Sequence, residues 1–162
     1  MLPLLAAFLL ATQPAPSATP APLGRTAWVF ATIGHSEWCP AGNVRVDLRT
    51  GLYAFTPRAS RRTCNREGLE RPVITGRLRA DRLAAVRAAA ARVWTESMVH
   101  PDCRDGRYPR DRIVISNGGR RILVLANGAT VLSAPDDLTC WSEAADALKA
   151  SLDEPFRSAH GR

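Results

Sequence analysis

The chain has 162 residues, of which 46% are hydrophobic, and it carries a formal net charge of +7. This length and composition are typical of one globular domain with its own hydrophobic core, and they exclude a fibrous or multidomain architecture. Lys149 is the single lysine among the 22 basic residues, and the densest arginine run lacks the aromatic residues or docking helix of a nucleic-acid interface. We therefore expect no nucleic-acid partner.

The chain begins with an apolar run over residues 2–11 that contains no charged side chain. A run of this length is too short to anchor a protein in a bilayer, but it is typical of a secretory signal peptide. We expect a signal peptide over residues 1–17, a linker rich in proline and alanine over 18–25, a folded domain over 26–155 and a polar tail over 156–162. The predicted localisation is periplasmic or secreted, with no transmembrane anchor once the signal is removed.

The elements expected in the first half are four strands and a helix. Strands are predicted at 27–33, 43–48, 52–55 and 73–78, because these segments are rich in β-branched and aromatic residues or alternate with period two. Gly51 supplies a hairpin turn that places Val44 opposite Phe55 or Thr56. Asp81 is the expected N-cap of a helix whose apolar positions recur at helical spacing, with Trp94 near its end.

The second half is predicted to begin with a loop over residues 99–111. Three strands follow at 113–115, 122–125 and 130–132, joined by turns at 117–119 and Asn127-Gly128. Ser133 is the expected N-cap of a last helix that ends at Pro155. The fold class is therefore α+β, with a mainly antiparallel sheet of about five to seven strands and two helices on one face.

The expected core combines the apolar faces of these strands and helices. Its predicted members are Val44, Val46, Leu83, Val86, Val93, Ile113, Ile115, Leu123, Leu125, Trp141, Leu148 and Leu152.

Four cysteines follow the leader: Cys39, Cys64, Cys103 and Cys140. In an oxidising compartment they are expected to form two disulfides. Continuing the pairing of the predicted hairpin brings Cys39 near residues 61–64, so we expect Cys39–Cys64 and, by consequence, Cys103–Cys140. No Cys-x-x-Cys spacing is present, so thioredoxin-type chemistry and the common zinc ribbons are excluded.

Two short clusters contain residue types that carry chemistry. His35 precedes Glu37 and Cys39, and His100 precedes Asp102 and Cys103. Either histidine could belong to a metal site or to a Ser-His-Asp triad, but cysteines consumed in disulfides cannot ligate a metal. We therefore assign no catalytic residue, no metal and no cofactor.

The densest basic segment contains Arg58, Arg61, Arg62 and Arg66, which are the candidate anion-binding residues. Such a patch can dock acidic polysaccharide, phosphate or lipid head groups, although a solvated loop in an arginine-rich chain is the simpler interpretation.

The order of these features resembles a widespread family of small exported bacterial domains of unknown function. The resemblance is carried by Cys39-Pro40, the hairpin from Val44 to Phe55, and Gly76 leading into the helix at Asp81, and it covers residues 26–153. It implies an exported accessory domain and assigns no catalytic residue.

The expected function is thus non-enzymatic binding of an anionic envelope component or a protein. Two alternatives stay open. One is a protease inhibitor that presents an arginine from the loop over residues 57–72, and the other is a small hydrolase that uses His35 or His100.

Overall fold

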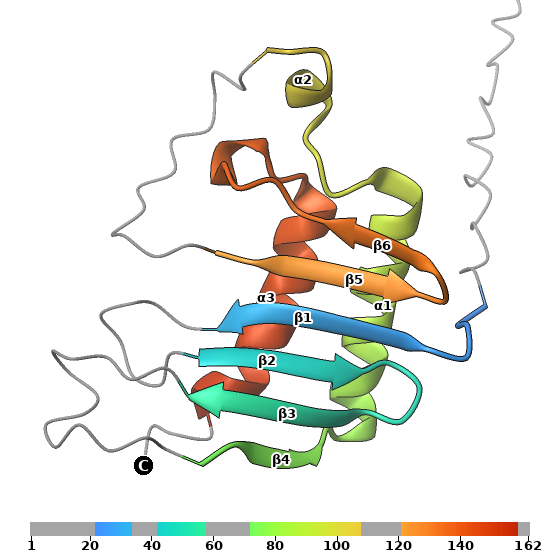
Figure 1. Ribbon diagram of the computed structural model, residues 1–162, viewed down its shortest axis with the longest axis vertical. Helices are drawn as coiled ribbons and strands as arrows, with labels where there is room; N and C mark the ends of the chain where they lie inside the picture. The colour runs from blue at the N-terminus through green and yellow to red at the C-terminus, as the bar shows by residue number, and fades with distance from the viewer. Residues whose placement is uncertain (1–21, 34–41, 58–71, 108–120, 159–162) are drawn as a thin grey trace, which may run out of the picture.

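A computed structural model describes residues 22–33, 42–57, 72–107 and 121–158, and every structural statement below concerns these residues. They form one antiparallel sheet of six strands in the order β4-β3-β2-β1-β5-β6. The two long helices, α1 (Ala80–Glu96) and α3 (Glu143–Ser158), pack against each other on one face of this sheet (Figure 1). The predicted α+β class and the antiparallel sheet are confirmed, the six described strands fall within the predicted range, and a third, short helix was not predicted.

Four strands come from the first half of the chain: β1 (Ala27–Ile33), β2 (Gly42–Asp47), β3 (Leu52–Pro57) and β4 (Ile74–Arg77). The period-two pattern puts Val44 and Val46 on the helix-covered face, where both are fully buried. Val44 pairs with Phe55, which confirms the predicted register. Gly51 has a φ of +74° in the β2–β3 turn, a conformation that favours glycine.

The second hairpin joins β5 (Leu123–Asn127) to β6 (Thr130–Ser133). The turn expected at Asn127-Gly128 lies one residue later, because Asn127 pairs with Thr130 and leaves Gly128 and Ala129 as the loop. The φ of +62° at Gly128 is the value that a type II′ turn takes at its first central position. Asn127 stays in the strand, where its side-chain oxygen accepts a hydrogen bond from the Gly24 amide at 2.5 Å. The strand expected at 113–115 and the turn at 117–119 lie outside the described residues.

Helix α1 spans Ala80–Glu96, and its N-cap is Arg79, so the prediction of Asp81 at that position was wrong. The first helical hydrogen bond runs from the Leu83 amide to the Arg79 carbonyl, which starts the helix two residues earlier. Asp81 instead lies in the first turn, 3.2 Å from the Arg79 guanidinium and close to the positive end of the helix dipole. Trp94 packs, partly buried, against the core as expected.

The segment over residues 99–111 was predicted to be a loop. This was wrong in part, because the segment contains one turn of helix. Helix α2 spans Pro101–Arg104, with proline in the first turn, where its missing N–H costs no hydrogen bond. His100 precedes it, and its Nδ1 accepts a hydrogen bond from the Asp102 amide at 3.2 Å. Val99, two residues before α2, forms an isolated antiparallel β-bridge with Trp141, which lies two residues before α3.

The last helix begins and ends later than predicted. Ser133 belongs to β6, and Asp137 caps a short 3-10 helix, η1 (Leu138–Cys140), by accepting a hydrogen bond from the Thr139 amide at 2.9 Å. Helix α3 then spans Glu143–Ser158, and Ser142 accepts the Ala145 amide at 3.1 Å, the bond typical of an N-cap residue.

The prediction that Pro155 ends this helix was also wrong, since α3 continues to Ser158. Phe156, expected in the tail, is 5% exposed and contacts Tyr53 and Phe55 with ring centroids 5.1 and 5.6 Å apart. Burial of this ring stabilises the last turn and offsets the cost of a proline within a helix.

The core lies between the sheet and the two long helices, and it contains most of the predicted residues. The buried members of that prediction are Val44, Val46, Val86, Val93, Leu123, Leu125, Trp141, Leu148 and Leu152. Leu83 is only partly buried at the edge of this cluster, and residues 113 and 115 lie outside the described part of the chain.

Candidate functional site: a hollow on the open face of the sheet

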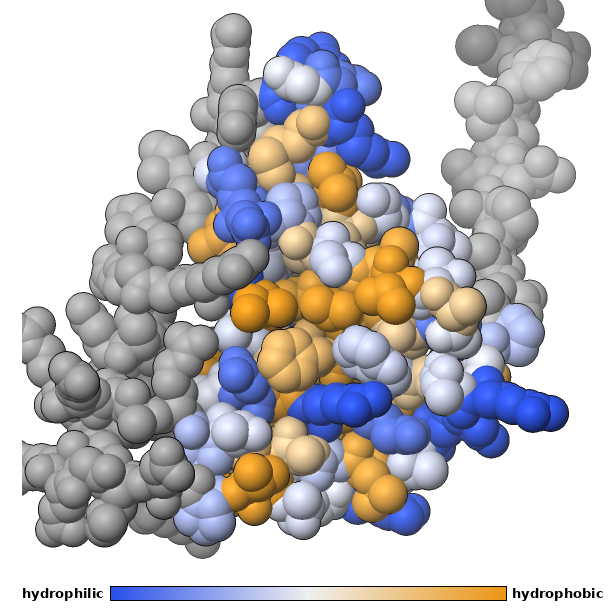
Figure 2. All heavy atoms as spheres, viewed as in Figure 1, coloured by the Kyte–Doolittle hydropathy of each residue, from blue (hydrophilic) through white to orange (hydrophobic). Residues whose placement is uncertain are grey.

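The face of the sheet opposite α1 and α3 carries a band of apolar side chains. Strand alternation places Trp28, Phe30, Val124 and Val131 on this face, because their neighbours Val29 and Leu125 point into the core. Figure 2 shows hydrophobic side chains gathered over β1, β5 and β6, with hydrophilic side chains beside them. We call this surface the open face. Val131 is 54% exposed on it, although an apolar side chain of this kind is usually buried.

The strand register arranges the open face in rows. One row runs from Val124 through Phe30 and Arg45 to Ala54, and the next places Trp28 beside Asp47. Arg45 and Trp28 are therefore diagonal neighbours on adjacent strands, a spacing that long and aromatic side chains can bridge.

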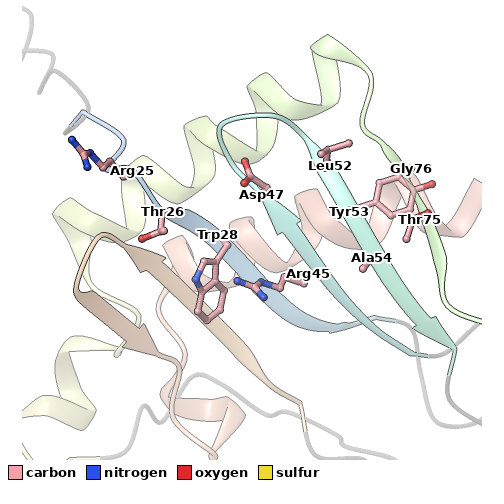
Figure 3. A pocket seen from close by; sticks show the side chains of 10 residues that line it. All are labelled: Arg25, Thr26, Trp28, Arg45, Asp47, Leu52, Tyr53, Ala54, Thr75 and Gly76. Atoms are coloured by element: carbon pink, nitrogen blue, oxygen red, sulfur yellow. The ribbon is translucent and has the colours of Figure 1, made fainter.

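A hollow of about 640 Å³ lies on the open face between the start of β1 and β4 (Figure 3). Its volume falls within the range of ligand pockets. The lining residues are Arg25, Thr26, Trp28, Arg45, Asp47, Leu52, Tyr53, Ala54, Thr75 and Gly76.

Arg45 and Trp28 point toward each other at one side of this hollow (Figure 3). The guanidinium carbon of Arg45 lies 4.8 Å from the centroid of the Trp28 ring, which is a cation–π contact. Such a contact stabilises the guanidinium beside the ring, and its N–H groups can donate hydrogen bonds.

The charges around the hollow are unequal. Arg25 and Arg45 line it, and within the described part of the chain neither guanidinium forms a salt bridge. Asp47 is the single acidic residue of the lining, and its Oδ1 accepts the amides of Arg49 and Thr50, each at 2.8 Å. This carboxylate is therefore engaged in the β2–β3 turn.

The pKa of Asp47 reflects this engagement. Partial burial raises the pKa, but hydrogen bonds from Thr50 and Arg49 and the positive charge of Arg49 outweigh it and lower the pKa below the ordinary value of 3.8. Asp47 thus stays ionised at neutral pH and accepts the backbone hydrogen bonds of the β2–β3 turn.

The structure brings together one pair of the residues that the sequence singled out. Cys103 and Cys140 form a disulfide across a separation of 37 residues, as predicted. The other predicted pair, Cys39 and Cys64, lies outside the described residues, so their pairing stays a prediction. The same holds for the candidate anion-binding residues Arg58, Arg61, Arg62 and Arg66, and for the cluster at His35.

His100 lies directly before α2 and close in sequence to the disulfide. Cys103 is consumed in the disulfide, and His100 Nδ1 accepts the Asp102 amide, so its role in the described structure is to cap α2. In the described ranges no group of three histidine, cysteine or acidic side chains is placed to hold a metal ion.

Trp28 and Arg45 were not singled out from the sequence. A signal for them exists, because the alternation that predicts Val44 and Val46 in the core also predicts Arg45 on the opposite face. The contact between them depends on which strands are neighbours in the sheet, and the alternation of one strand carries no such information.

The fold and the site together define an α+β domain with one helix-covered sheet face and one open face that carries a hollow. Comparisons with protein-family models, curated proteins and solved structures found no match. None of the helices in the described ranges has the length and apolar character needed to cross a bilayer.

Proposed function

We propose that this chain is an exported, non-enzymatic binding domain that docks a protein partner through the open face. The observation that carries the proposal is the apolar band formed by Trp28, Phe30, Val124 and Val131 on a sheet face that neither α1 nor α3 covers. Val131 is 54% exposed, and Trp28, Phe30 and Val124 are half-buried. An accessible apolar surface rimmed by polar side chains is typical of a protein-interaction site.

The residue types on the open face favour a protein over other partners. Tryptophan and arginine are enriched at the centres of protein interfaces, where they contribute most of the binding free energy, and Trp28 and Arg45 lie together here. An anionic polymer would contact the arginines but would leave the apolar band exposed to water.

A second copy of the chain is a poor partner for this face. A symmetric dimer would bring the arginines of two open faces together, and the net charge of +7 opposes close approach. The proposal therefore commits to a different protein.

Export is supported by the disulfide between Cys103 and Cys140, because structural disulfides persist in oxidising compartments. The periplasm or the medium is thus the proposed location, with residues 1–17 as the signal peptide. N-terminal sequencing of the exported protein tests this, and a chain that begins at Ala18 is the expected result.

The docking proposal is tested with a photo-crosslinking amino acid placed at Val131 in producing cells. The matched control places it at Ala88, an exposed alanine of α1 in the helical layer. The crosslinked protein is then purified and its dissociation constant is measured. Val131→Asp is expected to weaken binding about tenfold or more, and Ala88→Asp is expected to have little effect. Crosslinks from position 88 alone, or an unchanged dissociation constant for Val131→Asp, would contradict the proposal.

Three expectations from the sequence remain as alternatives that the described residues do not test, and one of them is a small hydrolase that uses His35 or His100. A protease inhibitor that presents the loop over residues 57–72 predicts stoichiometric inhibition of trypsin. Docking of an anionic envelope polymer through Arg58, Arg61 and Arg62 predicts retention on a heparin column that the triple charge-reversal variant loses.

A further inference from the structure

We infer that the partner presents an acidic residue beside an apolar one, and that the hollow on the open face binds this segment with Arg45 as the main contact to its carboxylate. This inference rests on the proposed function, because it names the chemistry of the partner segment at the same face.

The geometry of Arg45 suits a carboxylate. The guanidinium carbon lies 4.8 Å from the Trp28 ring centroid, and the guanidinium carries five N–H donors. A guanidinium presents these donors as a planar fork that matches the two oxygens of a carboxylate. In the described structure no acidic side chain lies within salt-bridge distance of Arg45. The donors are therefore available to a partner.

The charge of the surrounding surface is complementary to an acidic segment. Arg25 lines the hollow with Arg45, and Arg77 pairs in register with Leu52 on the same face. The single acidic lining residue, Asp47, directs Oδ1 to two backbone amides of its own turn. The lining of the hollow thus contains two arginines and one carboxylate, and that carboxylate accepts hydrogen bonds from its own turn.

The floor of the hollow explains why an apolar residue should adjoin the acid. Leu52 is 50% exposed, and Ala54, on the same face of β3, pairs with Arg45. Burying such a surface against an aliphatic or aromatic side chain contributes favourable free energy that a purely anionic ligand cannot supply. Thr26 and Thr75 add hydroxyl groups at the rim, which can bond to the backbone of a bound segment.

The experiment selects ligands from random sequences, so it does not require the natural partner to be identified. A phage-displayed library of random dodecapeptides is panned against the disulfide-intact protein, and enriched peptides are synthesised for affinity measurements. We expect enriched sequences with Asp or Glu next to an aromatic or aliphatic residue. Their affinity should fall about tenfold or more for Arg45→Gln and should weaken with added salt. The matched control is Arg92→Gln on the exposed side of α1, which should bind as the unmodified protein does.

The outcomes separate this inference from the proposed function. Peptides without acidic residues that lose affinity for Val131→Asp but not for Arg45→Gln would overturn the carboxylate inference and leave the docking proposal standing. Peptides insensitive to both substitutions would count against both. Competition by heparin or inorganic phosphate as effective as that by the free peptide would indicate a general anion site and overturn the inference. A library that yields no binder would overturn it as well, while the crosslinking experiment would still decide the proposed function.

Discussion

The guanidinium carbon of Arg45 lies 4.8 Å from the centroid of the Trp28 ring, across the boundary between β2 and β1. The two residues are 17 positions apart in the chain, counting from the sequence numbers, and the antiparallel register makes them diagonal neighbours. This contact places a charged group at the edge of an apolar surface, and both residues line the hollow on the open face.

The contact should be measurable as a coupling free energy. A double-mutant cycle that combines Trp28→Ala with Arg45→Ala is expected to give about 0.5–1 kcal/mol, the range of a cation–π pair at an exposed site. Urea unfolding of the four proteins supplies the values. The cycle of Arg45→Ala with Val131→Ala is the control, and equal coupling in both cycles would show that the contact contributes nothing of its own.

The disulfide should contribute a large share of the stability. Removing it in the double variant Cys103→Ala/Cys140→Ala is expected to cost about 4 kcal/mol in the chain-entropy model, because the bridge closes a loop of 37 residues. Chemical denaturation of both proteins measures the difference. A loss below about 1 kcal/mol would mean that this bridge constrains the unfolded chain far less than the model requires.

Leu148 tests the packing of α3 on the sheet. Its side chain is fully buried, so Leu148→Ala should cost about 2–5 kcal/mol from lost burial and the cavity left behind. Leu52→Ala makes the same chemical change at a half-exposed position on the open face and should cost much less. Similar losses at both positions, measured by urea unfolding, would be inconsistent with the described core.

Ser142 joins the start of α3 to the end of α1. Its Oγ accepts the Ala145 amide at 3.1 Å and donates to the Ser97 carbonyl at 2.7 Å. Ser142→Ala should therefore destabilise the domain by about 1–2 kcal/mol. Ser151→Ala on the same helix is the control, since that hydroxyl donates only to the carbonyl of Leu148 in its own helix. Equal melting temperatures for the two variants would argue against the capping role.

The lowered pKa of Asp47 should make the free energy of unfolding depend on pH. Its pKa in the folded chain lies below the ordinary 3.8, so its contribution is fully present above that pH and is lost as the pH falls through the folded value. Asp47→Asn keeps an oxygen that accepts the Arg49 and Thr50 amides but does not titrate. The unmodified protein should lose more stability than this variant between about pH 4 and about pH 2. Parallel losses would show that Asp47 titrates alike in both states.

The described strands and most of the core positions follow from the sequence alone because they depend on local periodicity. Alternation within residues 43–48 predicts which side chains of β2 face the helices, and the glycine at 51 predicts the turn that sets the register with β3. Helix ends were predicted less well. A cap depends on which backbone groups find partners, so Asp81, Ser133 and Pro155 each suggested a boundary that packing moved.

The candidate site could not be predicted from local periodicity. One strand's alternation shows that Arg45 points away from Val44 and Val46, but only the strand order puts Trp28 of β1 beside it and leaves β4 to complete the hollow. Likewise, Phe156 is buried because α3 carries it to Tyr53 and Phe55, which are about a hundred positions away in the chain. The sequence by itself determined the fold class and the faces of the strands, and it predicted the Cys103–Cys140 pairing that the structure shows. The tertiary structure decided which faces meet, since non-local contacts depend on the pairing of distant segments and not on the pattern within any one of them.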